Sequence, residues 1–302
     1  MARVAFLFSG QGAQYAGMGR ALCDRLPAAR QLFTEASGVL GYDLLDVCAD
    51  GPAERLNATA VSQPAIFVAS LAALESLRQT DPGAVAGCAG AAGLSLGEYT
   101  ALVFADVLSF RDGLRLVKRR GEAMQAAADA SPGAMVSVLG LDGPRVEELC
   151  AAARQGEEVL RVANLLCPGN VVVSGHRTAC DRVEPLVQQA GGRTVRLAVA
   201  GAFHTPLMQP AVAAMAEAFA TATFGPARIP VWSNVTAQPH PGPQGAGDLL
   251  RRQIVEPVRW EQTLRALLAA GYDRFYEVGP GRVLAGLLKR VQRKVDCQNV
   301  SA

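Results

Sequence analysis

The sequence has almost no net charge. Its 302 residues include 29 Lys and Arg against 27 Asp and Glu, a formal net charge of +2, and only 6% of the residues are aromatic. Proteins that bind nucleic acid commonly have basic runs interleaved with aromatic residues, and this sequence has none. We therefore expect no nucleic-acid partner.

Cysteine pairs and long hydrophobic runs are also missing. The seven cysteines are scattered and form no Cys-x-x-Cys pair, which excludes a zinc ribbon and favours reduced thiols in the cytoplasm. The apolar stretch Val4–Phe8 is too short for a signal peptide, and Pro64–Leu74 is well short of the ~20 residues of a membrane span. We expect a cytoplasmic protein with no membrane partner.

What is present is enough apolar sequence for a large core, arranged in alternating segments. Half of the residues are hydrophobic. Short apolar runs that predict strands (Val4–Phe8, Val171–Ser174 and Phe275–Val278) alternate with longer helical segments such as Pro64–Leu77 and Thr263–Ala270. This alternation predicts an α/β fold with a largely parallel sheet.

A second unit is predicted inside the chain, from six segments in the ferredoxin-like order β-α-β-β-α-β. The segments are Ala134–Gly140, Gly143–Ala153, Glu158–Asn164, Asn170–Gly175, Thr178–Ala190 and Arg193–Val199. Small and turn-forming residues flank them on both sides. We therefore predict a ferredoxin-like insert over residues 129–197, within a larger α/β body formed by residues 1–128 and 198–302.

The pentapeptide Gly93-Leu-Ser-Leu-Gly97 is the first candidate for chemistry. A Gly-x-Ser-x-Gly element between a strand and a helix forms a tight turn that exposes the serine hydroxyl as a nucleophile. The segment Leu96–Phe104 is a credible helix start, but Val85–Ala92 is a poor strand by propensity. Ser95 is therefore predicted to be a nucleophile, and an ordinary glycine-rich turn is the alternative.

A nucleophilic serine needs a base, and the sequence has only three histidines. His240 lies in a loop rich in Pro and Gly, Gln238–Gly247, and is predicted to be solvated. His176 follows a predicted strand at the start of a helix. His204, in the compact loop Gly201–Pro206, is the best candidate for the base. No acidic residue stands beside it, so a backbone carbonyl could equally orient its imidazole.

Two further segments could serve such a site. The turn Gly10-Gln-Gly-Ala-Gln14 follows the first strand and could present backbone N–H groups as an oxyanion hole, or alternatively bind a phosphate. The helix Asp112–Met124 carries a basic cluster, in which Arg119 lies opposite the apolar face. Lys118 and Arg120 flank that face, and helical geometry does not choose between them. The apolar face consists of Leu114, Val117, Gly121 and Met124.

Five motifs together resemble those of malonyl-CoA:acyl carrier protein transacylases, and the resemblance extends from the first strand to about Arg290. The motifs are Gly10-Gln-Gly-Ala-Gln14, Gly93-Leu-Ser-Leu-Gly-Glu-Tyr99, Arg120-Gly-Glu-Ala-Met-Gln125, Gly201-Ala-Phe-His204 and Glu277-Val-Gly-Pro-Gly281. The resemblance implies an α/β-hydrolase-like large subdomain, with a parallel sheet, and a ferredoxin-like inserted small subdomain. It also implies the roles of individual residues.

By this resemblance, Ser95 is the acylated nucleophile and His204 the general base. The backbone N–H groups of Gln11 and Leu96 would form the oxyanion hole. The substrate-binding residues implied are Arg120 for the malonyl carboxylate, Gln253 beside the site, and Phe203, which resembles the pattern of malonyl-selective members.

The sequence departs from the family at two places. Leu94 occupies a position that is histidine in many members. The loop residues Leu165, Leu166 and Cys167 stand where polar residues usually precede Pro168 and Gly169. We therefore expect this loop to offer the substrate fewer hydrogen bonds than usual.

The function implied is transfer of a malonyl group from malonyl-CoA to the phosphopantetheine thiol of acyl carrier protein, through a seryl acyl-enzyme and most simply in fatty-acid synthesis. It requires no cofactor and no metal, and we expect a monomer. The alternatives are a carrier-protein acyl hydrolase, a polyketide-type acyltransferase of the same fold, and a non-catalytic module that docks carrier proteins.

Overall fold

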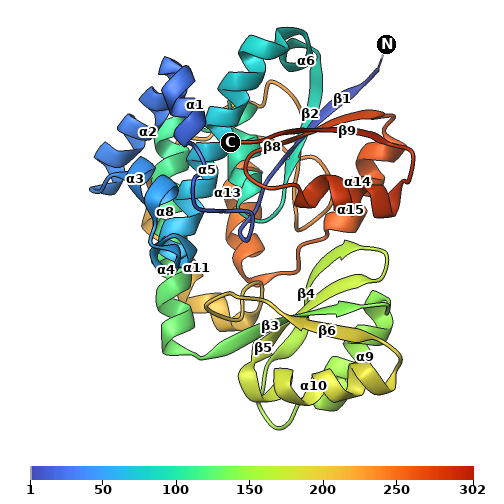
Figure 1. The fold of residues 1–302 in the computed structure, drawn as a ribbon. Coiled ribbons are helices and arrows are strands. Elements are labelled where there is room, and N and C mark those ends of the chain that lie inside the picture. Colours follow the sequence, from blue (N-terminus) through green and yellow to red (C-terminus); the bar gives the residue numbers. More distant parts are fainter. Residues whose placement is uncertain (1) are drawn as a thin grey trace.

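A computed structural model describes residues 2–302 and places them in two sheets with their covering helices (Figure 1). The larger sheet has five strands in the order β7-β2-β1-β8-β9, and all neighbouring strands are parallel. Its strands are β1 (Val4–Phe8), β2 (Cys88–Gly93), β7 (Val231–Trp232), β8 (Arg274–Val278) and β9 (Asp296–Val300).

Helices cover both faces of this sheet, as a buried parallel sheet requires. The helices of this larger body are α1 (Arg20–Arg25), α2 (Pro27–Leu40), α3 (Leu44–Asp50), α4 (Ala53–Asn57), α5 (Thr59–Thr80), α6 (Pro82–Ala86), α7 (Gly97–Phe104), α8 (Phe110–Ala130), α11 (Gln209–Ala214), α12 (Ala216–Thr221), α13 (Pro243–Val255), α14 (Trp260–Ala269) and α15 (Val283–Val291), with a 3₁₀ turn at Pro206–Met208. Strand β1 is central: Phe6 and Phe8 pack on the side of α5 and α7, and Leu7 packs on the side of α14 and α15.

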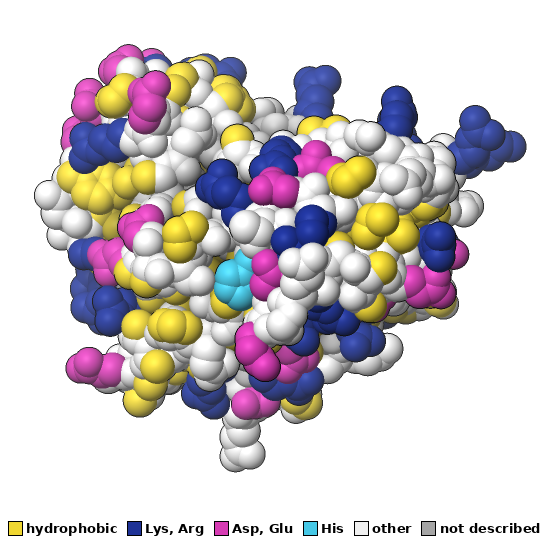
Figure 2. Space-filling view, turned by 90° about the horizontal axis from the view of Figure 1, so that it is seen from below, with side chains coloured by type: hydrophobic (Ala, Val, Ile, Leu, Met, Phe, Trp, Pro, Cys, Tyr) yellow, Lys and Arg dark blue, Asp and Glu magenta, His cyan; other side chains and the backbone are white. Residues whose placement is uncertain are grey.

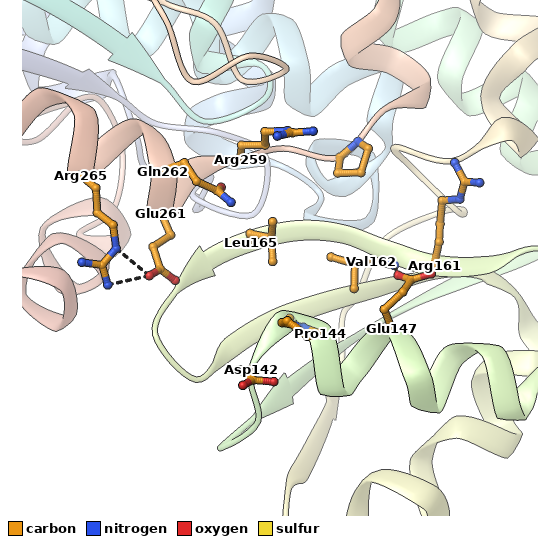
Figure 3. A pocket seen from close by; sticks show the side chains of 12 residues that line it. Asp142, Pro144, Glu147, Arg161, Val162, Leu165, Arg259, Glu261, Gln262 and Arg265 are labelled. Carbon is orange, nitrogen blue, oxygen red and sulfur yellow. Dashed lines mark hydrogen bonds and ion pairs between the residues drawn. The ribbon is translucent and has the colours of Figure 1, made fainter.

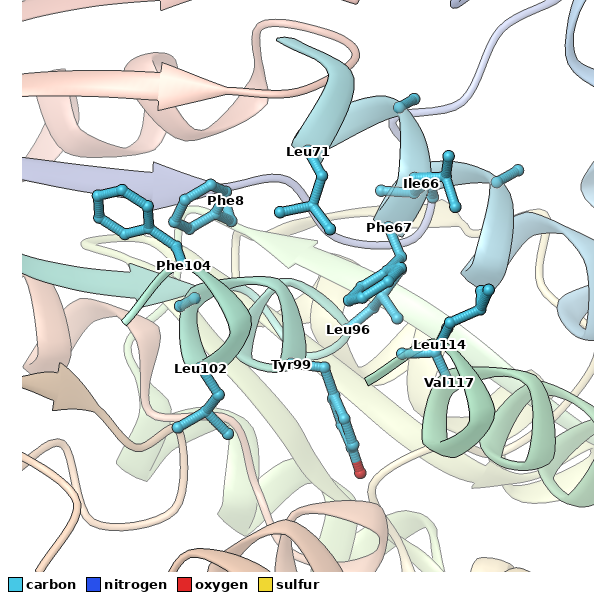
Figure 4. Close-up of a cluster of buried hydrophobic side chains, with 14 of the residues drawn as sticks. Phe8, Ile66, Phe67, Leu71, Leu96, Tyr99, Leu102, Phe104, Leu114 and Val117 are labelled. Carbon is cyan, nitrogen blue, oxygen red and sulfur yellow. The ribbon is translucent and has the colours of Figure 1, made fainter. Parts of the chain in front are cut away.

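The main hydrophobic core lies between the sheet and the helices α5, α7 and α8 (Figure 4). Phe6 and Phe8 both contact the ring of Phe104, with ring centroids 5.1 and 5.6 Å apart. Helix α5 is 22 residues long and apolar enough to span a membrane by length and composition, yet 78% of the qualifying window is buried within the protein. It is longer than the apolar run seen in the sequence, and it serves as a core helix here.

The second sheet has four strands in the order β4-β5-β3-β6, and each is antiparallel to its neighbours. It occupies the lower part of Figure 1 with helices α9 and α10. The elements are β3 (Gly133–Leu139), α9 (Gly143–Ala153), β4 (Leu160–Cys167), β5 (Asn170–His176), α10 (Arg177–Gln189) and β6 (Arg193–Arg196). The predicted fold class, a parallel α/β body with a ferredoxin-like insert, is confirmed.

Two local expectations differ from the structure. The segment before Ser95 forms strand β2 despite its poor propensity, because small residues permit close packing: a Cβ at Gly90 would lie 2.4 Å from the hydroxyl oxygen of Tyr272. The segment Gln238–Gly247 is not wholly an exposed loop, since α13 begins at Pro243 and Gly247 is buried.

Candidate active site

Ser95 lies in a sharp turn between β2 and α7. Its φ is +50°, a left-handed conformation that is uncommon for a residue other than glycine. A Cβ at Gly93 would lie 1.9 Å from the carbonyl carbon of Gly97, and a Cβ at Gly97 would lie 2.2 Å from the carbonyl oxygen of Phe8. Both glycines of the pentapeptide are therefore sterically required, and the turn is the strained elbow that the sequence predicts.

Two side chains distant in sequence hold the backbone of the elbow. Asn234 Oδ1 accepts from the backbone N–H of Ser95 at 2.6 Å, and Asn234 Nδ2 donates to the carbonyl of Gly93 at 2.8 Å. Gln253 Nε2 donates to the carbonyl of Ser95 at 2.9 Å. These bonds stabilise the unusual conformation of the elbow and fix the position of its hydroxyl.

The hydroxyl of Ser95 lies 2.9 Å from Nε2 of His204. The other ring nitrogen, Nδ1, lies 2.7 Å from the backbone carbonyl oxygen of Gln253. Because a carbonyl only accepts, Nδ1 carries the proton and Nε2 is free to accept from Ser95 Oγ. The imidazole is thus oriented by a backbone carbonyl, one of the alternatives that the sequence leaves open.

His204 is held neutral by its surroundings. Its side chain is buried, and this burial, together with the positive charge of Arg120, lowers its pKa from an ordinary 6.5 to about 4. Nε2 is consequently unprotonated near neutral pH. A neutral imidazole in contact with a serine hydroxyl is the arrangement that general-base catalysis needs.

Arg120 is the only one of the three basic residues of α8 at positions 118–120 that contacts Ser95. Its guanidinium is buried, with Nη2 donating to Ser95 Oγ and to Gln253 Oε1, each at 3.0 Å. Nη1 donates to Gln63 Oε1 at 2.7 Å. Lys118 instead bonds the carbonyl of Val39, and Arg119 is half exposed. Of Lys118 and Arg120, the structure places Arg120 beside Ser95.

The turn after β1 packs directly against the elbow. A Cβ at Gly10 would lie 2.4 Å from the carbonyl oxygen of Leu94, so the turn approaches as closely as its glycine permits. Gln11 follows, and its side chain donates to Thr59 Oγ1. Leu96 is the residue before the first turn of α7, where backbone N–H groups lack partners within the helix. Phe203 is buried in the hydrophobic cluster that also contains Leu96.

The prediction that His240 is solvated was wrong, whereas His176 lies at a strand end and a helix start, as the sequence predicts. The side chain of His240 is only 4% exposed, and its Nε2 lies 2.7 Å from Oε1 of Glu98, itself fully buried. His176 lies at the end of β5 in the insert, where its Nδ1 accepts from the N–H of Val159. Sequence reasoning also missed Glu98, although it belongs to the quoted motif.

The two departures from the family place apolar side chains against the core. Leu94 and Leu166 are partly buried and pack on the cluster around Leu7, and Cys167 is buried in it. Nearby, Asn164 is almost fully buried, and its Oδ1 has no hydrogen-bond partner within residues 2–302. Leu165, Leu166 and Cys167 form the end of strand β4 and not a loop, and Leu166 and Cys167 contribute packing together with Leu94.

A cavity of about 790 Å³ lies elsewhere, where the insert meets α14 (Figure 3). Its wall carries both charge signs, including the ion pair Arg265–Glu261. The lining comes from α9, β4 and the segment through α14, and includes Asp142, Glu147, Arg161, Val162, Leu165, Pro257, Arg259 and Gln262. The face of the molecule in Figure 2 likewise mixes basic and acidic side chains, in keeping with the small net charge.

Comparisons with known proteins agree on one family. The acyl transferase domain family matches residues 5–301. Malonyl CoA-acyl carrier protein transacylase of Escherichia coli K12 is 40% identical over 303 residues, covering 100% of this chain and 96% of its own length. The human mitochondrial malonyl-CoA-acyl carrier protein transacylase is 43% identical over 295 residues, covering 94% of this chain and 75% of its own.

Solved structures give the same result. The malonyl CoA-acyl carrier protein transacylase of Coxiella burnetii superposes with a TM-score of 0.94 at 36% identity, covering 99% of this chain and 94% of its own. A malonyl-transacylase solved in complex with a type II polyketide synthase acyl-carrier protein superposes with a TM-score of 0.92 at 36% identity, covering 100% and 96%.

Proposed function

Since this chain belongs to the malonyl-CoA–acyl carrier protein transacylase family, we propose that it moves a malonyl group from malonyl-CoA to the phosphopantetheine thiol of an acyl carrier protein. The observation that carries the proposal is the contact of one serine hydroxyl with both a neutral histidine and a buried arginine. The serine and the histidine supply the groups for acyl transfer, and the arginine supplies a partner for a carboxylate.

In the first half-reaction, His204 Nε2 takes the proton of Ser95 Oγ as Oγ attacks the thioester carbon of malonyl-CoA. The backbone N–H groups of Gln11 and Leu96 hold the oxyanion of the tetrahedral intermediate. The carbon–sulfur bond then breaks, and the imidazolium returns the proton to the departing thiolate. A malonyl ester remains on Ser95.

In the second half-reaction, His204 takes the proton of the phosphopantetheine thiol, and the sulfur attacks the seryl ester. The intermediate collapses with return of the proton to Ser95 Oγ, and malonyl leaves on the carrier protein. No metal or redox group takes part in either step. All of these groups come from one chain, so we propose that a monomer is sufficient for the reaction. We also propose that the protein is cytoplasmic and that the acceptor is the carrier protein of fatty-acid synthesis.

A carrier-protein hydrolase of the same architecture is the second candidate, because water could replace the thiol. Arg120 favours transfer of a carboxylate-bearing acyl group over hydrolysis of neutral chains, since a buried cation beside the nucleophile disfavours an apolar acyl chain. The intact contact between Ser95 and His204 speaks against a module that only docks carrier proteins.

The proposed function predicts a covalent intermediate. Brief exposure of the intact protein to excess malonyl-CoA without carrier protein should add the mass of one malonyl group, since no carrier-protein thiol is present to accept it. Addition of phosphopantetheinylated carrier protein should then remove the adduct and transfer it. Intact-protein mass spectrometry measures both steps. Loss of the adduct to water at the same rate, with or without carrier protein, would identify a hydrolase instead.

Arg120→Ala should lower kcat/KM for malonyl-CoA. The loss of transition-state stabilisation should be roughly 2–5 kcal/mol, the effect of removing one partner of a buried charged pair. Acetyl-CoA has no carboxylate to lose, so its rate should be unchanged or raised. Arg120→Lys should recover only part of the malonyl activity, because a point charge does not reproduce the two-point contact of a guanidinium.

The measurement is the ratio of malonyl to acetyl transfer, with melting temperatures taken alongside. Arg119→Ala is the matched control, since this neighbour on α8 is half exposed and does not contact Ser95. Equal losses on both substrates would make Arg120 structural. A ratio that responded only to Lys118→Ala would move the carboxylate site there.

A further inference from the structure

Glu98 is a fully buried carboxylate one helical turn beyond the nucleophile, on α7. It accepts three hydrogen bonds. Oε2 accepts from Gln253 Nε2 at 2.6 Å and from the backbone N–H of Asn234 at 3.1 Å, and Oε1 faces His240 Nε2 at 2.7 Å. None of these atoms touches Ser95 Oγ, so Glu98 acts on the site only through its partners.

Two of the three partners are the residues that hold the elbow. Asn234 clamps the backbone around Ser95, and Gln253 contacts Ser95, Arg120 and His204. The side-chain amide of Gln253 has one orientation available: Oε1 faces the Arg120 guanidinium, and Nε2 faces the carboxylate of Glu98. A flipped amide would set donor against donor and acceptor against acceptor. Glu98 thereby fixes both clamps of the elbow.

The third partner of Glu98 is the side chain of His240. Its Nδ1 is buried and has no hydrogen-bond partner among residues 2–302, so Glu98 is the sole polar partner of the ring there. The backbone of His240 is tied to the sheet, with its N–H donating to the carbonyl of Val231 in β7. The backbone of His240 is thus held beside β7, and its Nε2 lies against the buried carboxylate of Glu98.

We propose that Glu98 and His240 are positioning residues for acyl transfer: His240 fixes the Glu98 carboxylate, which fixes Gln253 and Asn234 and so aligns the Ser95 hydroxyl. This proposal rests on the proposed function for its substrate but not for its geometry. The hydrogen bond between His240 and Glu98 comes from the loop Gln238–Gly242, which the sequence predicted to be solvated.

The test uses two readouts on the full-length protein. One is malonyl transfer, separated into kcat and KM. The other is the rate at which a fluorophosphonate labels Ser95. In that reaction Oγ bonds to phosphorus, fluoride leaves and His204 takes the proton, so it reports alignment of the nucleophile without any malonyl substrate. A failure of the proposed function would abolish transfer by the wild type but leave the labelling comparison intact.

His240→Ala should lower kcat and the labelling rate each by about tenfold, the scale of one lost bond to a charged group, with KM changed less than about twofold. His240→Gln, whose amide nitrogen reaches the place of Nε2, should restore at least half of both. Glu98→Ala removes the acceptor of all three hydrogen bonds and should lower kcat and the labelling rate each on the order of 10²-fold. In a Glu98→Ala background, His240→Ala should have no further effect, because its bond is already gone.

His176→Ala is the matched control, since that histidine also bonds a neighbouring segment but lies in the insert. It should leave both readouts at the wild-type level. Wild-type kcat and labelling in His240→Ala would overturn the proposal. So would a loss in His240→Ala that His240→Gln fails to restore, or losses that add fully in the double variant, because packing and not the hydrogen bond would then be responsible.

Discussion

Replacement of Ser95 by alanine is expected to lower kcat for malonyl transfer by at least about 10⁴-fold, because the variant lacks the hydroxyl proposed to form the acyl-enzyme. Ser95 Oγ is the atom in contact with both His204 Nε2 and Arg120 Nη2. The bonds that hold the elbow go to backbone atoms of residue 95 and remain in the variant. The fold should therefore be preserved, with a melting temperature close to that of the wild type.

Intact-protein mass spectrometry after exposure to malonyl-CoA checks this directly. The Ser95→Ala protein should carry no adduct, whereas Ser174→Ala, which removes a buried hydroxyl from β5 of the insert, should be acylated like the wild type. A stable malonyl adduct on Ser95→Ala would disprove the assignment. Loss of the adduct together with loss of the folded state would require a Ser95→Cys comparison, which should retain a nucleophile in the same turn.

The parts of the site that could be predicted from the sequence are those encoded locally. The pattern Gly-x-Ser-x-Gly between a strand and a helix indicates an elbow, and Gly93 meets a steric demand of the turn itself, because a Cβ there would collide with Gly97. The order of strands and helices in residues 129–197 similarly indicates the ferredoxin-like sheet. In both cases the pattern and the structure that it forms occupy the same short stretch of chain.

The parts that could not be predicted depend on contacts across the fold. Helical geometry leaves Lys118 and Arg120 equivalent, and the choice is made by the close approach of α8 to α5, where a Cβ at Gly121 would lie 2.8 Å from the carbonyl oxygen of Thr59. Asn234 is 139 residues from Ser95 and carries no local signal. His240 lies among prolines and glycines that indicate exposure, but pairing of its loop with β7 buries it.

The last prediction concerns the protonation state of His204. Its pKa is lowered to about 4 because burial and the charge of Arg120 both disfavour the imidazolium. The base is therefore unprotonated above about pH 4, and kcat/KM for acylation should fall only as the pH drops through that value. An ordinary histidine would lose activity near 6.5. The acid limb of kcat/KM, which reports the free enzyme, measures this pKa.

His204→Ala should lower kcat/KM by roughly 10²–10⁴-fold at neutral pH, the usual contribution of a general base, and should abolish the limb near pH 4. KM should change little, since Arg120 still holds the carboxylate. The charge of Arg120 contributes to the depressed pKa, so Arg120→Ala should move the limb to higher pH and Arg119→Ala should not. A profile that kept its acid limb in His204→Ala, or one that His176→Ala removed instead, would show that another group is the base. The direction of the Arg120→Ala shift is the sharper observation, because only a base beside that guanidinium would respond to it.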